Sequence, residues 1–341
     1  MKKILVLSLA LLAVVGCQKK DDCPCNTASD QSVSVTVQVQ GTTMTKASGV
    51  EYADEARVSN LQILAFNAYG ELESYVTVDN ETSATLLASS GQKTVWAVVN
   101  APSLASIEQI EDLQEAVSNL SDNALNAFVM TGNVTEELTD GAVINITVKR
   151  IVAKVSIEKI TAAFPDTPAY AGKDLVVTGI YMLNVGAAQD YPVAAAPAAW
   201  YNKLYHLDEE ADTFLYDALS ETIANNTSYA VAHDYYPYPN SVDVSVLSLD
   251  PEVRGTWSPR RSILCIEVTF GGEVGYYPIE MPVIQRNKHY RILEVILSRR
   301  PGSLPYVPIE TGNATVTITV DDWEEVIIPG NTTEPGIIVI Q

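Results

Sequence analysis

The stretch from Ser32 to Gly49 has the sequence SVSVTVQVQGTTMTKASG, and it decides how the first half of the chain is organised. Four valines alternate strictly with polar residues, which predicts a β-strand with one apolar and one polar face. Burying four valine side chains contributes about 6–12 kcal/mol before entropic costs. We therefore expect the strand to belong to the core of the first domain. The apolar positions are Val33, Val35, Val37 and Val39.

The residues after this strand form a polar loop with one basic side chain, Lys46, followed by Ala47, Ser48 and Gly49. A loop of small residues with a single lysine is a site that a trypsin-like protease can enter. The sequence thus predicts a strand that the fold needs, joined to the rest by a loop that can be cut. An ordinary first strand with an ordinary loop explains the same pattern equally well.

The first seventeen residues, MKKILVLSLALLAVVGC, have the form of a lipoprotein signal peptide. Two lysines precede an apolar run that is too short to span a bilayer as a helix. The residues before Cys17 have the shape of a lipobox, in which the peptidase cuts before a cysteine that is then acylated. Acyl chains, palmitate among them, would anchor the precursor to a membrane through Cys17. The alternative is a signal peptide with an incidental cysteine.

Composition excludes several classes of protein. The chain has 341 residues, 47% of them hydrophobic, which is enough for about two globular domains. Its formal net charge of −21 argues against nucleic-acid binding. Cys23 and Cys25 lie too close together for a relaxed disulfide and have no further metal ligand nearby, and Cys265 lies in an apolar strand as a small core residue.

Strands and one helix are predicted along the rest of the chain. Apolar residues from Leu104 to Leu120 recur every three or four positions, which predicts an amphipathic helix with Ser103 as N-cap. Many short strands separated by turns predict a β-sandwich in each half, with the proline-containing segment 164–173 between them. Strands of the second half are expected at Leu175–Leu183, Val242–Leu249, Ile263–Phe270, Tyr276–Met281, Tyr290–Leu297 and Ala314–Val320.

The last residues form an apolar, β-prone run at a chain end, which promotes aggregation unless it pairs with another strand. One interpretation is a last strand that pairs within its own domain. The other is a strand that pairs with another subunit by β-strand addition. The run consists of Ile337, Ile338, Val339 and Ile340.

No pattern of catalytic residues, metal ligands or cofactor-binding residues is present, so we expect neither an enzyme nor a cofactor. Of the three histidines, His233 next to Asp234 is expected to form a solvated pair, and His289 to cap a turn. The Tyr235–Tyr238 segment could offer an aromatic platform for a glycan, although a packed loop explains it more simply.

Several short motifs, in this order behind a lipobox, resemble the major fimbrillins of Bacteroidetes type V pili, the FimA-type subunits. The resemblance covers essentially the whole chain. The motifs are Ser90-Gly91-Gln92-Lys93-Thr94, Met130-Thr131-Gly132, Val148 to Val155, Ile263-Leu264-Cys265, Gln285 to Tyr290 and Val320 to Trp323.

The resemblance implies a mostly β protein with two transthyretin-like Greek-key β-sandwich domains and one short amphipathic helix in the first. It also implies a route: delivery to the outer membrane as a lipoprotein, removal of the first strand by a trypsin-like surface protease, and insertion of another subunit's tail into the resulting groove. The partners would be other copies of the chain or related fimbrial subunits, in a fibre that serves adhesion.

Mapped onto this sequence, the cut falls between Lys46 and Ala47. Family members cut by an arginine-specific protease carry arginine there, so a cut after Arg57 is the alternative; we prefer Lys46 because Arg57 adjoins the next strand. An anchor or tip subunit and a monomeric ligand-binding lipoprotein are the other functional alternatives. The implied divisions are 1–17 signal peptide, 18–46 propeptide, 47–165 first sandwich, 166–325 second sandwich and 326–341 donor-strand tail.

Overall fold

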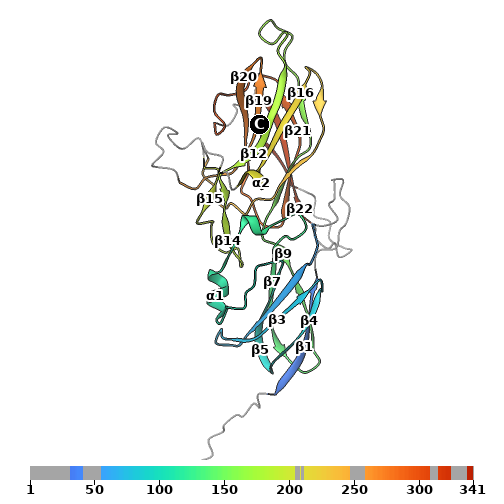
Figure 1. Ribbon diagram of the computed structural model, residues 1–341, viewed down its shortest axis with the longest axis vertical. Helices are drawn as coiled ribbons and strands as arrows, with labels where there is room; N and C mark the ends of the chain where they lie inside the picture. Colours follow the sequence, from blue (N-terminus) through green and yellow to red (C-terminus); the bar gives the residue numbers. More distant parts are fainter. Residues whose placement is uncertain are drawn as a thin grey trace, which may run out of the picture. The chain divides into compact units, whose positions relative to one another are not determined.

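The computed structural model describes residues 31–40, 55–203, 208, 211–245, 258–307, 314–323 and 336–340 (Figure 1). The chain divides into two compact units, Met1–Gln31 and Ser32–Gln341, and only the second is described below. Strands dominate it, which confirms the predicted mostly β fold, and the sheets fit a β-sandwich.

Three short helical segments are present among these residues, α1 (Ile110–Glu115), the 3-10 turn η1 (Leu120–Asp122) and α2 (Asp212–Leu215). The strands up to residue 162 are β1 (Ser32–Gln40), β2 (Asn60–Phe66), β3 (Leu72–Asp79), β4 (Ser83–Ser89), β5 (Gly91–Val99), β6 (Val117–Asn119), β7 (Met130–Leu138), β8 (Val143–Thr147), β9 (Lys149–Arg150), β10 (Lys154–Ile157) and β11 (Ile160–Ala162). The later strands are β12 (Leu175–Leu183), β13 (Val185–Gly186), β14 (Ala188–Asp190), β15 (Trp200–Tyr201), β16 (Tyr216–Ile223), β17 (Ser228–Tyr229), β18 (His233–Tyr235), β19 (Ile263–Phe270), β20 (Glu273–Glu280), β21 (Lys288–Leu297), β22 (Ala314–Asp322) and β23 (Gly336–Ile340).

The first half contains two sheets that enclose one core. A three-stranded sheet has the order β4-β1-β8, and a five-stranded sheet has the order β3-β2-β5-β7-β9. Alternate residues of β2 and β5 pack on the valines of β1, whereas Leu64, Phe66 and Trp96 belong to a second, larger core. The five-stranded sheet is therefore buried on both faces in its middle, which is why β2 has a nearly continuous apolar sequence.

The second half contains a seven-stranded and a four-stranded sheet. The first has the order β17-β11-β21-β10-β18 and continues from β21 through β22 to β23; the second has the order β16-β12-β19-β20. Their apolar faces share the larger core, for example Val155, Ile266 and Ile292. Cys265 is fully buried beside Tyr181, so the thiol behaves as the predicted core residue.

The predicted amphipathic helix is much shorter than its apolar spacing suggests. Only Ile110–Glu115 is helical, and Gln109 rather than Ser103 is the N-cap. Before it, the backbone bonds to the start of β3, with the Leu72 N–H donating to the Glu108 carbonyl. After it, β6 pairs with β14. Of the predicted apolar positions, Val117 is 54% exposed, whereas the others named next are buried, because an irregular segment satisfies most of the same spacing: Leu104, Ile107, Leu113 and Leu120.

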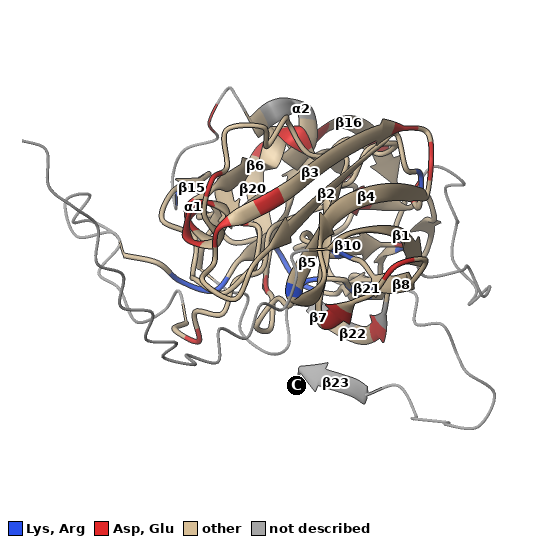
Figure 2. Cartoon of the chain, turned by 90° about the horizontal axis from the view of Figure 1, so that it is seen from below, with Lys and Arg blue, Asp and Glu red and all other residues tan. Residues whose placement is uncertain are grey.

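The predicted strands of the second half are present with one exception. Residues 242–245 form no regular strand, and 246–249 lie outside the described residues. Acidic residues are exposed on several strands, for example Asp79 on β3 and Glu136 on β7. Figure 2 shows acidic residues in red on β3 and few basic residues in blue. This distribution agrees with the strongly negative net charge.

Candidate functional site

The strand β1 lies in the middle of its sheet, between β4 and β8 (Figure 2). Ser32–Gln38 run antiparallel to Ser83–Ser89 of β4, and Thr36–Gln40 run parallel to Val143–Thr147 of β8.

The backbone groups of β1 alternate between these two neighbours. The Val39 N–H donates to the Thr82 carbonyl over 2.8 Å on the β4 side, and the Thr36 N–H donates to the Ala142 carbonyl over 3.0 Å on the β8 side. Removal of β1 would therefore leave unpaired donors and acceptors on both β4 and β8.

The apolar face of β1 is almost completely buried. Val35 and Val37 are 0% exposed, and Val33 and Val39 are 4% and 6% exposed. They pack in one cluster with residues of β2, β4, β5 and β8. Without β1, the space between β4 and β8 would be an apolar groove about nine residues long. The sequence predicted both the strand and its buried face.

The predicted processing residues Cys17, Lys46 and Ala47 lie outside the described residues. The alternative cut site, Arg57, has an exposed side chain, although its place next to the following strand led us to prefer Lys46. Its backbone is nevertheless held, because its carbonyl accepts a hydrogen bond from the Asn100 side chain over 2.7 Å. The neighbouring Ser59 N–H donates to the same side chain over 2.8 Å. A protease must pull this backbone free before it can cut there.

The tail strand β23 pairs with β22 of the same chain in the structure. The pairing is antiparallel, and Val316 lies opposite Ile340 and Thr319 opposite Ile337. β22 itself pairs with β21 on its other side. Of the two interpretations of the tail, the intramolecular strand is the state adopted here, so insertion into another subunit would first require β23 to leave β22.

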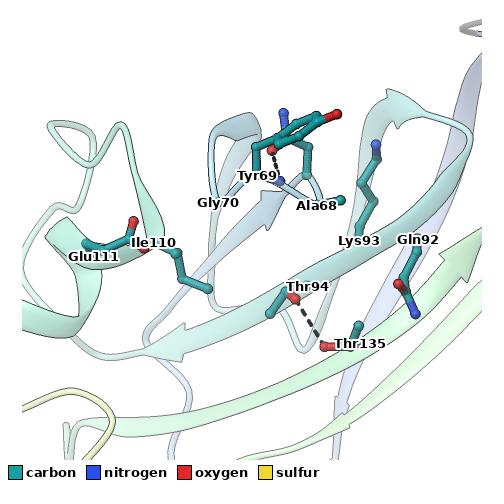
Figure 3. Close-up of a pocket in the computed structure, with 10 residues that line it drawn as sticks. Ala68, Tyr69, Gly70, Gln92, Lys93, Thr94, Ile110, Glu111 and Thr135 are labelled. Carbon is teal, nitrogen blue, oxygen red and sulfur yellow. Dashed lines mark hydrogen bonds between the residues drawn. The ribbon is translucent and has the colours of Figure 1, made fainter.

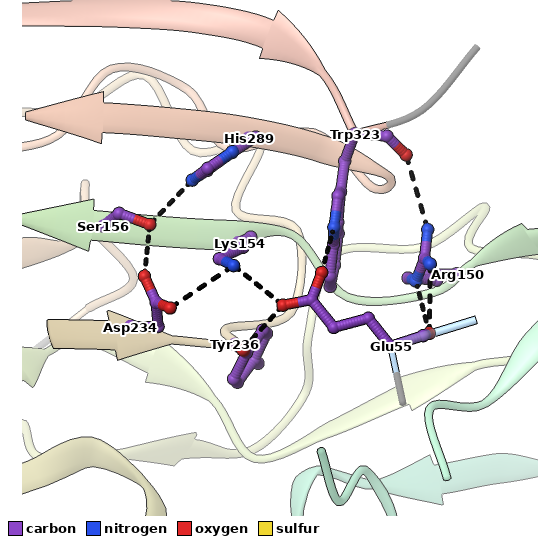
Figure 4. A network of polar contacts seen from close by, with 8 residues as sticks. All are labelled: Glu55, Arg150, Lys154, Ser156, Asp234, Tyr236, His289 and Trp323. Atoms are coloured by element: carbon purple, nitrogen blue, oxygen red, sulfur yellow. Dashed lines mark hydrogen bonds and ion pairs between the residues drawn. The ribbon is translucent and has the colours of Figure 1, made fainter. Parts of the chain in front are cut away.

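A buried polar cluster joins distant parts of the chain and was not predicted from the sequence (Figure 4). We call it the Glu55 cluster. Glu55 is 3% exposed, and its carboxylate accepts hydrogen bonds from Lys154 at 2.7 Å, Tyr236 at 3.0 Å and the Trp323 indole at 2.9 Å. Its members are Glu55, Arg150, Lys154, Ser156, Asp234, Tyr236, His289 and Trp323.

Arg150 holds the backbone at two points of this cluster. Its guanidinium donates to the Glu55 carbonyl over 3.0 and 3.1 Å and to the Trp323 carbonyl over 3.4 Å. The same group lies 4.3 Å from the centre of the Trp323 ring, in a cation–π arrangement. Lys154 additionally forms an ion pair with Asp234 over 3.3 Å. The buried charges thus have partners, as burial requires.

The serine, histidine and aspartate of the cluster do not form an activated nucleophile. Ser156 donates its hydroxyl hydrogen to Asp234 and lies 2.6 Å from Nε2 of His289, so the imidazole donates to the serine oxygen. A catalytic histidine instead accepts the proton of the serine. Ser156 is also only 3% exposed. Burial, together with the charges of Lys154 and Arg291, lowers the pKa of His289 to about 3, which keeps the ring neutral.

The histidine expectations need correction. His289 lies within β21 and does not cap a turn. His233 binds Asp217 over 2.8 Å, while the Asp234 side chain is 9% exposed and belongs to the Glu55 cluster, so the two do not form a solvated pair. Contact of His233 with Asp217 lowers the pKa of that carboxyl group.

No aromatic platform is present at residues 235–238. Tyr235 and Tyr238 are 1% and 0% exposed, which confirms the packed loop. The one large exposed aromatic side chain among the described residues is Tyr69, which is 87% exposed above a pocket of about 370 Å³ (Figure 3). Lys93 in that pocket forms an ion pair with Glu73 over 2.9 Å, so its charge is not available to a ligand.

Within the described ranges, no three histidine, cysteine, aspartate or glutamate side chains are grouped so that they could hold a metal ion. None of the helices in the described part of the chain has the length and apolar character needed to cross a membrane.

Residues 32–161 match the family model described as major fimbrial subunit protein (FimA). The match begins at the first residue of β1 and ends in β11. Over these residues, the chain is similar to FimA-type fimbrial subunits. Within residues 32–161, the match confirms the resemblance seen in the motifs. Curated proteins yield no match.

Several solved structures share the fold of this chain at low sequence identity. The fimbrilin of Porphyromonas gingivalis W83 aligns with a TM-score of 0.61 and 16% identity, covering 86% of this chain and 98% of the other. A candidate cell adhesion protein of Parabacteroides distasonis ATCC 8503 aligns with a TM-score of 0.63 and 18% identity, covering 87% of this chain and 98% of the other. The C-terminally truncated tip fimbrial protein Mfa3 of P. gingivalis aligns with a TM-score of 0.54 and 16% identity, covering 86% of this chain and 100% of the other. Because a fimbrilin and a tip protein share this fold, the fold alone does not distinguish the two roles.

Proposed function

We propose that the chain is the structural shaft subunit of a surface pilus that serves adhesion, and that subunits assemble by strand exchange after proteolysis. The observation that carries this proposal is the position of β1. It is a central strand with four buried valines, and the predicted cut lies six residues beyond its end. One cut therefore separates from the chain a strand that the first domain requires.

In this proposal, the acylated Cys17 brings the precursor to the outer membrane surface, and a trypsin-like protease cuts between Lys46 and Ala47. The released segment takes β1 with it. The tail of another copy, residues 326–341 with its four apolar residues Ile337–Ile340, then enters the groove and restores hydrogen bonds on β4 and β8. Such head-to-tail contacts do not close into a ring and therefore produce a filament.

The pairing of β23 with β22 supports a further step. In the monomer, the backbone of the tail pairs with β22 along one side, and β23 is the edge strand of that sheet. The donor strand has to leave this pairing before it binds a second subunit. Exchange is therefore favourable only when the acceptor groove offers more burial than β22 does.

Trypsin digestion of the precursor without its signal peptide, residues 18–341, tests this function. We expect a new N-terminus at Ala47 by mass spectrometry, followed by a ladder of SDS-resistant oligomers. Lys46→Gln should remain uncut at this bond and monomeric. A chain ending at Gly336 should be cut normally but form no ladder. A clean cut of the full chain that leaves a persistent monomer would contradict strand exchange and favour an accessory subunit or a monomeric ligand-binding lipoprotein.

A further inference from the structure

Two large apolar side chains lie exposed on the outer face of the β4-β1-β8 sheet. Leu87 of β4 is 63% exposed, and Val143 of β8 is 55% exposed. They flank β1 from opposite sides, because Leu87 lies opposite Ser34 and Val143 lies beside Thr36. In the precursor, β1 therefore presents two polar residues between two exposed apolar ones.

The geometry at Ser34 brings side chains close together. Its N–H donates to the Asp140 carboxylate over 3.0 Å, and its carbonyl accepts from the Gly141 N–H over 2.9 Å, both on the β8 side. Ser34 and Leu87 are therefore a non-hydrogen-bonded antiparallel pair, in which Cα atoms are about 4.5 Å apart and the side chains touch. An apolar residue at the position of Ser34 would cover Leu87.

The tail differs from β1 in being apolar on both faces. Ile337, Ile338, Val339 and Ile340 are consecutive, so any extended conformation places two of them on each face. β1 needs apolar residues on only one face. A tail bound in place of β1 would thus fill the groove with two side chains and present two apolar side chains on the outer face, where Leu87 and Val143 lie.

We propose that the tail of a second copy enters the groove in the direction of β1, with Ile338 at the position of Val35 and Ile340 at the position of Val37. Ile337 then contacts Leu87, and Val339 contacts Val143. This inference rests on the proposed strand exchange and adds its register. Leu87 and Val143 are residues that select a donor strand with apolar residues on both faces.

The register follows from burial. Val35 and Val37 are 0% exposed, and this register gives both positions an isoleucine. Gly336 falls at the position of Val33, which leaves room for the two additional methylene groups. A shift by one residue toward the start of β1 would place Gln341 at the position of Val37, where its amide would be buried. A shift by one residue the other way would place Gly336 at the position of Ser34 and leave Leu87 uncovered.

The direction follows from the two pairings of β1. The groove is shaped by an antiparallel neighbour and a parallel one, whose hydrogen bonds are spaced differently, so a strand with the direction of β1 fits both without rearrangement. A reversed strand with Ile340 at the position of Ser34 would also cover Leu87 and Val143. It would run parallel to β4 and antiparallel to β8, which is the opposite of the pairings that these strands form with β1.

Disulfide formation between two variants tests the register. One signal-less precursor carries Leu87→Cys and serves as acceptor; the other carries Ile337→Cys and serves as donor. They are mixed, processed with trypsin and oxidised, and the disulfide-linked peptides are identified by mass spectrometry. The distance of a non-hydrogen-bonded pair lies within the range that a disulfide accepts. The buried Cys265 does not compete, since it is 0% exposed.

Three further donor variants, Ile338→Cys, Val339→Cys and Ile340→Cys, are the matched controls. We expect a disulfide with the Leu87→Cys acceptor at least tenfold more often for the Ile337→Cys donor than for any control. Preferential linkage of the Ile338→Cys or the Val339→Cys donor would overturn the register, and preferential linkage of the Ile340→Cys donor would overturn the direction, while ladders in each case would leave strand exchange standing. Absence of ladders with the unmodified chain would instead overturn strand exchange itself, and with it this register.

Discussion

The indole nitrogen of Trp323 donates a hydrogen bond to the carboxylate of Glu55 over 2.9 Å, although the two residues are 268 positions apart. Glu55 is the first described residue after the segment that contains Lys46, and Trp323 is the last described residue before the segment that leads to β23. Arg150 binds the backbone carbonyls of both. The segment proposed to be cut and the segment proposed to donate a strand are therefore connected to two residues that bind each other and Arg150.

Replacing Trp323 by phenylalanine should lower the free energy of unfolding by about 1–3 kcal/mol, because one oxygen of the buried Glu55 carboxylate loses its donor. Urea unfolding of the precursor measures the loss. Trp96→Phe is the matched control, since Trp96 is 6% exposed and its indole nitrogen has no hydrogen-bond partner. Equal losses of unfolding free energy in both variants would show that the hydrogen bond to Glu55 adds no stability beyond that of the larger ring.

Val35→Ala should destabilise the unprocessed precursor by about 2 kcal/mol, because Val35 is fully buried and its removal leaves a cavity. Ser34→Ala, on the outer face of the same strand, should change stability by less than about 0.5 kcal/mol. Fibres grown from the Val35→Ala precursor should dissociate under the same conditions as wild-type fibres, because β1 is absent from them. A change in fibre stability would mean that β1 remains in the assembled subunit.

The parts of the fold that the sequence predicts are those set by local periodicity. The alternation from Val33 to Val39 predicts both β1 and its buried face, since side chains of a strand point to opposite sides. The helix prediction over 104–120 was too long because the same apolar spacing suits an irregular segment that bonds to β3 and β14. The periodicity of a segment does not show which neighbouring strands form hydrogen bonds with it.

The Glu55 cluster could not be predicted for a related reason. It depends on strand register: Ser156 of β10 lies opposite Asp234 of β18, and Lys154 lies beside His289 of β21. Lys154, His289 and Trp323 fall within motifs that resemble fimbrillins, but Glu55 lies in a segment with no motif. Only the assembled sheet brings these side chains together.

The stability of the chain should fall as the pH decreases from about 6.5 to about 3, in part because of His289. The ring has a pKa of about 3 in the fold and takes up a proton near pH 6.5 when unfolded, so the unfolded state binds one more proton over this interval. The groups that face it are Ser156, Lys154 and Arg291, with Asp234 beyond the serine.

One proton corresponds to a slope of about 1.4 kcal/mol per pH unit in the unfolding free energy. His289→Gln, which keeps a donor for Ser156, should reduce the measured slope between pH 6 and pH 4 by about that amount. Urea unfolding at a series of pH values provides the measurement. An unchanged slope would show that His289 is protonated equally in the folded and unfolded states.

Gly132→Ala should destabilise the first half of the chain strongly, because the added Cβ would lie 2.2 Å from the carbonyl oxygen of Thr147. Thr147 is the last residue of β8, and β8 forms one wall of the groove that holds β1. The clash involves backbone, so relief requires β8 to move away from β7. We expect a loss of about 3 kcal/mol or more in the free energy of unfolding, measured with urea, and faster release of β1 after trypsin cutting.

Gly302→Ala is the control, since its Cβ would meet only the Tyr276 carbonyl oxygen at 3.6 Å, an ordinary contact. Similar small losses for both variants would mean that β8 tolerates displacement, and that the close approach of β7 and β8 does not fix the width of the groove.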